Sequence, residues 1–282
     1  MRVGRIPYIN CFPVYGAIDR RIVALQGDVV TGVPSELNRA MATGELDVSV
    51  VSAVEYARDS RRYLLLPDLA ISCHGPVRSV LLFSKRPAAE LGGRRVIVSR
   101  SSMTSVLLLE LLFEAVWKSR PEFVPGDAEL SDLASFAHED HEARLVIGDA
   151  ALLLQARDAH PQAAAPSVAY PHVYDLGTEW RMWTGLPFVF AVWVAQRTTP
   201  VAESLGAHAA LIGSRDWGLR HLDELSRQAS VQTGVPAAAC RAYFSGLDYG
   251  LGYEYLAGLT EFFGRLAASG RMPATSLQFL AA

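Results

Sequence analysis

An asparagine near the start of the chain stands where a polar side chain can meet a ligand. Residues 5–15 read Arg-Ile-Pro-Tyr-Ile-Asn-Cys-Phe-Pro-Val-Tyr, so a short apolar strand leads to Asn10 and a helix is expected behind Pro13. Open α/β sheets bind ligands beyond the carboxyl ends of their strands. Asn10 is therefore a candidate catalytic residue that can donate or accept a hydrogen bond, although an amide is not an effective base.

A run of hydroxyl side chains marks a second place for chemistry. Residues 99–105 hold five serines or threonines in seven positions, between an expected strand and an expected apolar helix. Unpaired N–H groups and the positive end of the helix dipole attract a carboxylate or phosphate at such a helix start. Ordinary capping would explain one serine, but five hydroxyls favour an anion site. The candidate binding residues here are Ser101, Ser102, Thr104 and Ser105.

A second junction between a strand and a helix, at residues 147–152, places a glycine beside a carboxylate. Gly148 allows close approach of the backbone to a ligand, and we include it among the binding residues. Asp149 either caps the following helix or faces the ligand as a catalytic carboxylate, and the spacing leaves both roles open. Ser52 and Ser79 also lie at the ends of expected strands and complete the set of candidate binding residues.

Motifs for a metal, a nucleotide or covalent catalysis are missing. His138 and His141 are three positions apart, whereas the zinc-binding helix H-E-x-x-H needs four, so we predict a solvated loop at residues 138–142. The sequence holds no G-x-G-x-x-G, P-loop or G-x-S-x-G. Cys11, Cys73 and Cys240 form no C-x-x-C pair and are expected to be reduced. We expect neither a metal nor an organic cofactor.

The elements that position these residues follow an α/β pattern. Expected strands and helices alternate in the first third of the chain, with strands at residues 2–8, 28–33 and 48–52 and helices at 13–22 and 35–43. This βαβ order implies a parallel sheet with right-handed crossovers. Ser35 is predicted to cap the second helix and Gly44 to end it.

A middle region has strand-helix units of its own. Strands are expected at residues 94–99 and 143–147, followed by helices at 104–117 and 150–157, and two longer strands, 78–84 and 186–195, bracket them. We therefore predict a second lobe, residues 87–191, inserted into a first lobe formed by residues 1–86 and 192–282. Two strands would cross between the lobes, and the cleft there is a natural binding place.

The composition favours a small-molecule ligand over a polymer or a membrane. The 282 residues are 50% hydrophobic and carry a formal net charge of -3 that is spread through the chain. No basic stripe for nucleic acid and no polybasic patch for a membrane is present. The longest apolar runs are too short to cross a bilayer, and no secretory signal precedes the first strand, so a cytoplasmic location is expected. The oligomeric state is left open.

Taken together, several segments resemble the chorismate dehydratases of the futalosine route to menaquinone. They are residues 6–15, 79–84, 147–152, 175–180 and 183–191. The opening P-Y-x-N-x-x-P and the later W-T-G-L-P-F-V-F-A are specific when found together, and the resemblance spans most of the chain. It implies an α/β fold of the periplasmic-binding-protein-like type II, in which two lobes are joined by two hinge strands and the site serves catalysis.

The resemblance also implies a reaction, the dehydration of chorismate to 3-[(1-carboxyvinyl)oxy]benzoate. Chorismate is a dianion, so the serine and threonine hydroxyls would hold its carboxylates through neutral donors. We expect an E1cB elimination in which Asn10 donates a hydrogen bond to the departing hydroxyl or positions the enolpyruvyl side chain of the substrate. The base is either Asp149 or, as we favour, the enolpyruvyl carboxylate of the substrate itself.

Two other functions are open at this point. A binding protein of the same fold would capture a small carboxylate in the same cleft without reaction, but its usual export signal is missing. The sister enzyme of the same pathway, which forms dihydroxynaphthoate, shares the fold but begins with a different turn. The opening segment favours the dehydratase.

Overall fold

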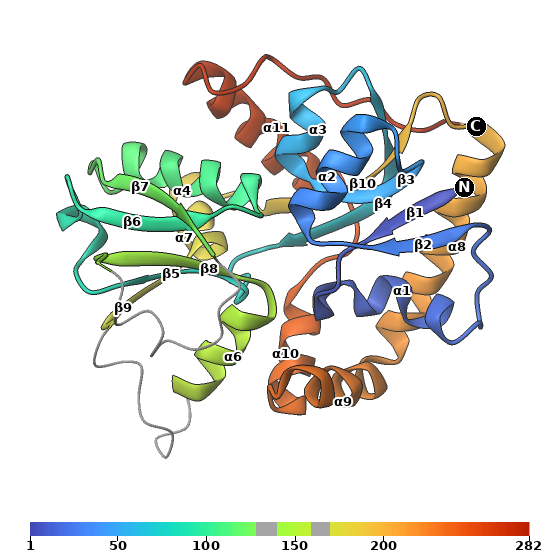
Figure 1. The fold of residues 1–282 in the computed structure, drawn as a ribbon, viewed down its shortest axis with the longest axis horizontal. Helices are drawn as coiled ribbons and strands as arrows, with labels where there is room; N and C mark the ends of the chain where they lie inside the picture. The colour runs from blue at the N-terminus through green and yellow to red at the C-terminus, as the bar shows by residue number, and fades with distance from the viewer. Residues whose placement is uncertain (128–139, 159–169, 282) are drawn as a thin grey trace.

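The computed structural model describes residues 1–127, 140–158 and 170–281, which form two β-sheets with helices packed around them (Figure 1). The first sheet has the strand order β2-β1-β3-β10-β4, and the second has the order β7-β6-β8-β5-β9. We call each sheet with its helices a lobe. The strands of the first lobe are β1 (Arg2–Arg5), β2 (Asp28–Thr31), β3 (Val48–Ser52), β4 (Tyr63–Cys73) and β10 (Phe188–Gln196). Those of the second lobe are β5 (Val80–Ser84), β6 (Arg95–Ser99), β7 (Glu122–Gly126), β8 (Ala143–Ile147) and β9 (His172–Asp175).

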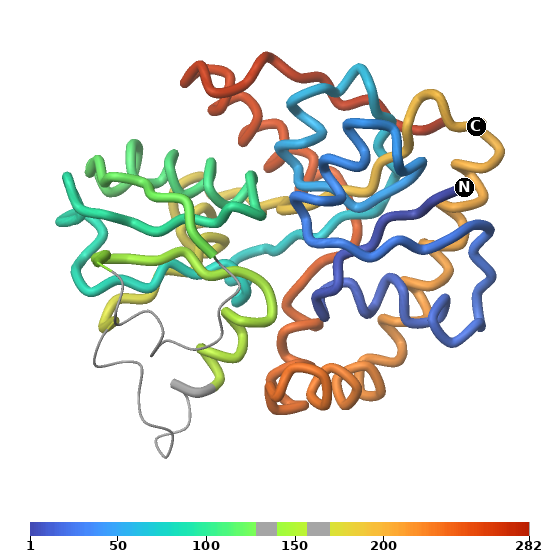
Figure 2. Tube along the Cα trace, viewed as in Figure 1, coloured from blue at the N-terminus to red at the C-terminus, as the bar shows by residue number. Residues whose placement is uncertain are grey.

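Helices cover both sheets, and those of the first lobe come from both ends of the chain (Figure 1). They are η1 (Ile9–Cys11), α1 (Phe12–Asp19), α2 (Pro34–Thr43), α3 (Ala53–Arg58), α8 (Val201–Arg220), α9 (Leu222–Thr233), α10 (Ala237–Gly246) and α11 (Tyr253–Ala268). The second lobe has η2 (Ala88–Glu90), α4 (Met103–Ala115), α6 (Gly148–Asp158) and α7 (Leu176–Thr184). Both chain termini lie on the first lobe, and the second lobe is built from the middle of the chain (Figure 2).

The predicted βαβ unit at the start of the chain is confirmed. Strand β1 pairs in parallel with both β2 and β3, and α1 and α2 form the crossovers. The predicted cap at Ser35 is wrong: Val33 is the N-cap, and Pro34 occupies the first helical position, where its fixed φ suits the helix and no N–H is needed. Gly44 ends α2 as predicted, with a left-handed φ of 77°.

The division between the sheets differs from the predicted lobe boundaries. Strand β5 pairs with β8 and β9, so Val80–Ser84 belongs to the second sheet, although the prediction assigned residues 1–86 to the first lobe. On the return, all of β10 lies in the first sheet, although the prediction placed residues 188–191 in the second lobe. A strand pattern shows that a segment is extended and buried, but not which sheet accepts its hydrogen bonds.

Two antiparallel strands, β4 and β10, connect the lobes. They pair along most of their length, and their junction-side ends meet at Cys73 and Phe188. Of the predicted pair of connecting strands, the one at residues 186–195 is confirmed as β10, but the one at residues 78–84 is wrong, because β5 lies within the second sheet and β4 connects the lobes instead. The chain reaches the second sheet through residues 74–79 and returns through α7 (Figure 2).

The tryptophans near this connection fill the core. Trp180 and Trp193 are fully buried. The indole N–H of Trp180 donates to the carbonyl of Pro187 at 3.1 Å, and that of Trp193 donates to the hydroxyl of Tyr15 at 3.3 Å.

The three cysteines are buried and free, as expected. No helix in the described part of the chain is long and apolar enough to span a membrane. The cytoplasmic location stays a prediction.

The predicted solvated loop at residues 138–142 is wrong for its second histidine. His141 is only 2% exposed, and its Nε2 lies 2.8 Å from the hydroxyl of Tyr170, so the ring is held in the second lobe's interior. His138 and Glu139 lie outside the described residues. Within the described ranges, no three potential metal-ligating side chains of His, Cys, Asp or Glu cluster together.

Candidate active site

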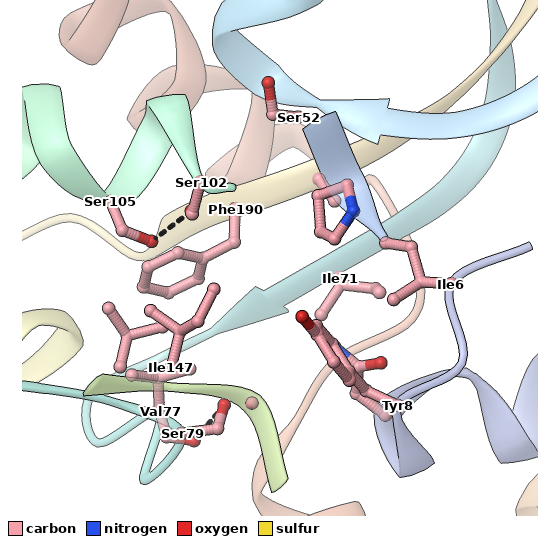
Figure 3. Close-up of a pocket in the computed structure, with 15 residues that line it drawn as sticks. Ile6, Tyr8, Ser52, Ile71, Val77, Ser79, Ser102, Ser105, Ile147 and Phe190 are labelled. Carbon is pink, nitrogen blue, oxygen red and sulfur yellow. Dashed lines mark hydrogen bonds between the residues drawn. The ribbon is translucent and has the colours of Figure 1, made fainter. Parts of the chain in front are cut away.

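A pocket lies where the two lobes meet, with residues of both lobes in its wall (Figure 3). Its empty space is about 570 Å³, including the part open to solvent. None of the described residues that line it carries a charged side chain. Its polar wall consists of the side chains of Tyr8, Asn10, Ser52, Ser79, Ser102 and Ser105. The rest is apolar apart from the backbone of Gly148, so a ligand here meets neutral donors and acceptors.

The predicted catalytic asparagine lies in this wall. Asn10 belongs to the single turn η1 and lies beyond the carboxyl end of β1, as expected, although β1 ends at Arg5 and not at the predicted residue 8. Its Oδ1 atom is buried and has no hydrogen-bond partner among the described residues. A buried acceptor left unpaired is costly. A hydroxyl or another donor of a ligand would satisfy it.

The adjacent cysteine is inert. Burial raises the pKa of Cys11 to about 12, so its side chain stays a protonated thiol. Cys11 is fully buried and packs in the hydrophobic core.

Two of the four hydroxyls predicted at the start of α4 reach the pocket. Ser102 is the N-cap residue, and its hydroxyl donates to the hydroxyl of Ser105 at 2.7 Å, beside the ring of Phe190 (Figure 3). The N-cap side chain accepts no backbone N–H of α4, and Ser99 Oγ instead accepts the N–H groups of Ser101 and Ser102, which precede the helix, each at 3.0 Å. The Ser102 and Ser105 hydroxyls are thus left at the helix start, where the dipole favours an anion.

The other two predicted hydroxyls lie elsewhere. Thr104 is 1% exposed, and its Oγ1 accepts the backbone N–H of Val54 in α3 at 3.1 Å, which joins the two lobes. Ser101 does not line the pocket, and its hydroxyl lies 3.0 Å from that of Ser99. In a helix, residues three apart share a face but neighbours do not. Ser102 and Ser105 therefore face the ligand side, and Thr104 faces the first lobe.

Asp149 does not stand in the pocket wall, and its side chain instead forms a hydrogen bond between the two lobes. Its carboxylate accepts the backbone N–H of Ile9, at 3.1 Å from Oδ1 and 3.4 Å from Oδ2, and so links α6 to η1 across the junction of the lobes. Burial raises the pKa of this carboxyl group to about 6, against the lowering effect of the Ile9 N–H. The residue is not among those that line the pocket.

Gly148 does permit a close approach, but the approaching group is a side chain. Its φ is 66°, and a Cβ added there would lie 3.3 Å from the ring of Tyr8. Glycine therefore lets the second lobe come against a ring of the first lobe at the edge of the pocket.

The two remaining predicted serines both line the pocket. Ser52 caps α3, because its Oγ accepts the backbone N–H of Glu55 at 3.1 Å, and it also accepts the amide of Asn38 at 3.1 Å. The hydroxyl of Ser79 accepts a hydrogen bond from the phenol of Tyr243 at 2.9 Å. Sequence reasoning missed Tyr243, which is 164 positions from Ser79 and lies in no motif.

Two α/β lobes joined by paired strands, with a ligand pocket between them, define a protein with the periplasmic-binding-protein-like fold. A solved structure of a protein from Archaeoglobus fulgidus superposes with a TM-score of 0.76, at 20% identity, over 95% of this chain and 97% of its own. The alkanesulfonate-binding protein SsuA from Xanthomonas axonopodis pv. citri, bound to MOPS, superposes with a TM-score of 0.68, at 13% identity, over 98% and 95%. At these identities the likeness establishes the fold alone.

Sequence comparison defines the family within this fold. A family model described as menaquinone biosynthesis matches residues 1–268, and the chain belongs to that family. Chorismate dehydratase of Thermus thermophilus is 32% identical over 264 residues, which are 91% of this chain and 94% of the relative. Chorismate dehydratase of Campylobacter jejuni is 27% identical over 68% of this chain and 66% of its own.

Proposed function

We propose that the protein is a chorismate dehydratase, a hydro-lyase that converts chorismate to 3-[(1-carboxyvinyl)oxy]benzoate and water. The observation that carries this proposal is a pocket walled by hydroxyls and an amide, in a chain that is 32% identical over nearly its whole length to a chorismate dehydratase. The neutral hydrogen-bond donors of this wall can hold the carboxylates of a dianionic substrate.

The hydroxyl groups at the start of α4 are the first proposed contact with a substrate carboxylate. Ser102 and Ser105 sit at the amino end of a helix of 13 residues, so the helix dipole adds to their donors. Ser79 offers a third hydroxyl from the opposite part of the wall (Figure 3). Donors fixed in place within a mostly apolar pocket bind anions without a large reorganisation.

The proposed reaction removes a proton from ring carbon three and a hydroxyl from ring carbon four. The carbon-three proton is conjugated through the adjacent double bond with the ring carboxylate, so its removal leaves a stabilised dienolate. The electron pair then expels the carbon-four hydroxyl, which leaves with the abstracted proton as one water molecule, and the ring becomes benzenoid. Aromatisation drives the step forward.

Asn10 is the proposed partner of the departing hydroxyl. Its amide lies in the pocket wall, and the Nδ2 N–H groups can donate a hydrogen bond to the oxygen of the departing hydroxyl. The amide can position the substrate but cannot take the carbon-bound proton.

The proposed base is the enolpyruvyl carboxylate of the substrate. The alternative, Asp149, is engaged by the Ile9 N–H and does not line the pocket, which supports a base on the substrate itself. The enolpyruvyl carboxylate and the carbon-three proton belong to the same substrate molecule, so the protein does not have to supply a base.

Incubation of the purified protein with chorismate tests the proposal. We expect chorismate to be consumed and an aromatic product lighter by one water molecule to appear, as read by absorbance and mass spectrometry. The Asn10→Ala protein should lose turnover while still binding the product. Recovery of bound but unchanged chorismate from the natural protein would instead make this a binding protein, and near-normal turnover by Asn10→Ala would remove Asn10 from the mechanism.

A further inference from the structure

A buried tyrosine of the first lobe contacts the pocket serine at the entrance to the second lobe. Tyr243, in α10, is 2% exposed, and its hydroxyl donates to Ser79 Oγ at 2.9 Å. Ser79 is itself 5% exposed and lines the pocket. The bond thus ends on a hydroxyl that faces the ligand space, unlike the bonds that merely cap helices.

The hydrogen of the Ser79 hydroxyl has only a weak partner in the protein. Its contact with the carbonyl of Val77 is 3.4 Å long, which is beyond the range of about 2.5–3.0 Å that is usual for a hydroxyl donor. Because the phenol occupies a lone pair of Ser79 Oγ, that hydrogen is the group left for a ligand. A carboxylate oxygen is a far stronger acceptor than a distant carbonyl.

The backbone that carries Ser79 is held firmly. The carbonyl of Ser79 accepts the N–H of Gly148 at 2.8 Å. The carboxylate of Asp175 accepts the N–H groups of Val77 at 3.0 Å and of Arg78 at 2.6 Å, and Arg78 has a left-handed φ of 62°. A non-glycine residue at positive φ persists where its surroundings fix it. With the backbone fixed, the direction of the Ser79 hydroxyl is set by its side-chain torsions and by the hydrogen bond from Tyr243.

We propose that Tyr243 is a positioning residue that fixes the Ser79 hydroxyl so that its proton points to a carboxylate of the substrate. This inference rests on the proposed function, because it takes chorismate as the ligand. The phenol, the serine hydroxyl and the carboxylate then form one donor chain, in which each bond polarises the next. Burial raises the pKa of Tyr243 above its ordinary value, so the phenol is protonated and can donate at neutral pH.

The test is a double-mutant cycle of Tyr243→Phe and Ser79→Ala. Tyr243→Phe keeps the ring and removes the donor, so we expect KM and the Kd of chorismate to rise about tenfold with kcat little changed. In the Ser79→Ala background the same change should have no further effect, because the hydroxyl that it positions is gone.

Tyr249→Phe is the matched control. Tyr249 is equally buried at 1% exposure, lies outside the pocket wall, and its hydroxyl has no hydrogen-bond partner among the described residues. The Tyr249→Phe protein should bind and convert chorismate as the unchanged protein does.

The outcomes separate this inference from the proposed function. If the unchanged protein binds chorismate without converting it, the dehydratase proposal fails, and the cycle on Kd still decides the role of Tyr243. The inference is overturned if Tyr243→Phe matches the unchanged protein. It is equally overturned if the variant weakens binding by the same factor with and without Ser79, since that would mean only a general loss of packing.

Discussion

Replacing Asp149 by asparagine should make the protein more stable at neutral pH. Its pKa, raised from 3.8 to about 6 by burial, means that the ionised form is disfavoured in the folded protein. At about 1.36 kcal/mol per pH unit, the full effect on the free energy of unfolding is about 3 kcal/mol. Asparagine has nearly the same shape, and its amide oxygen can still accept the Ile9 N–H.

The sign of the pH dependence follows from where the proton binds more tightly. The folded protein holds the Asp149 proton more strongly than the unfolded chain does, so this group favours folding most below pH 3.8. Its contribution to the free energy of unfolding then falls as the pH rises toward about 6 and is constant above that. The gain from Asp149→Asn should therefore be close to zero at about pH 3 and approach its full value at pH 7.

Urea unfolding at a series of pH values measures this difference directly. Asp248→Asn is a suitable control, because its carboxylate also accepts a backbone N–H, from Gly250 at 2.8 Å, but the residue is exposed. The control should show no gain that grows with pH. A difference between the unchanged protein and Asp149→Asn that does not vary with pH, or a variant that is less stable at pH 7, would refute the account of this carboxylate.

The same Asp149→Asn protein decides the identity of the base. Turnover close to normal would agree with a base on the substrate. Lost turnover with product binding retained would move the base to Asp149.

The remaining predictions concern the start of α4 and the turn at Gly148. Thr104→Val should lower the free energy of unfolding by about 1 kcal/mol and leave KM unchanged, because it removes only the bond to Val54. Ser102→Ala should raise KM several-fold and leave the stability unchanged. A change of KM in Thr104→Val would contradict the placement of Thr104 away from the pocket. Gly148→Ala should lower stability by about 1–2 kcal/mol in thermal or urea unfolding, because φ is 66° and the new methyl group would press on Tyr8; an unchanged midpoint would show that the ring yields freely.

Local sequence patterns located the buried strands well. The ends of β3 and β8 were predicted to the residue, since short valine- and isoleucine-containing runs that are followed at once by helix starts leave little freedom. The position of Asn10 at the end of β1 followed from the same logic, and the resemblance of whole segments indicated the family.

The direction in which each side chain points could not be predicted in the same way. The hydroxyl run gave a helix start but not its rotation, so Thr104 was grouped with Ser102 although the two point to different neighbours. The partner of Asp149 is a backbone group 140 positions away, and that of Ser79 is a phenol further still along the chain. Such pairs are set by how the lobes dock, which no local pattern encodes.

The hydrogen bonds from Asp149 to Ile9 and from Thr104 to Val54 share a property that bears on how this protein can change over evolutionary time. In each, one lobe supplies a side chain and the other supplies only its main chain. Positions 9 and 54 can therefore accept other apolar residues without loss of either bond, while positions 149 and 104 cannot lose their oxygen atoms. These two bonds therefore constrain the side chains of the second lobe more tightly than the buried apolar side chains that the first lobe places opposite them.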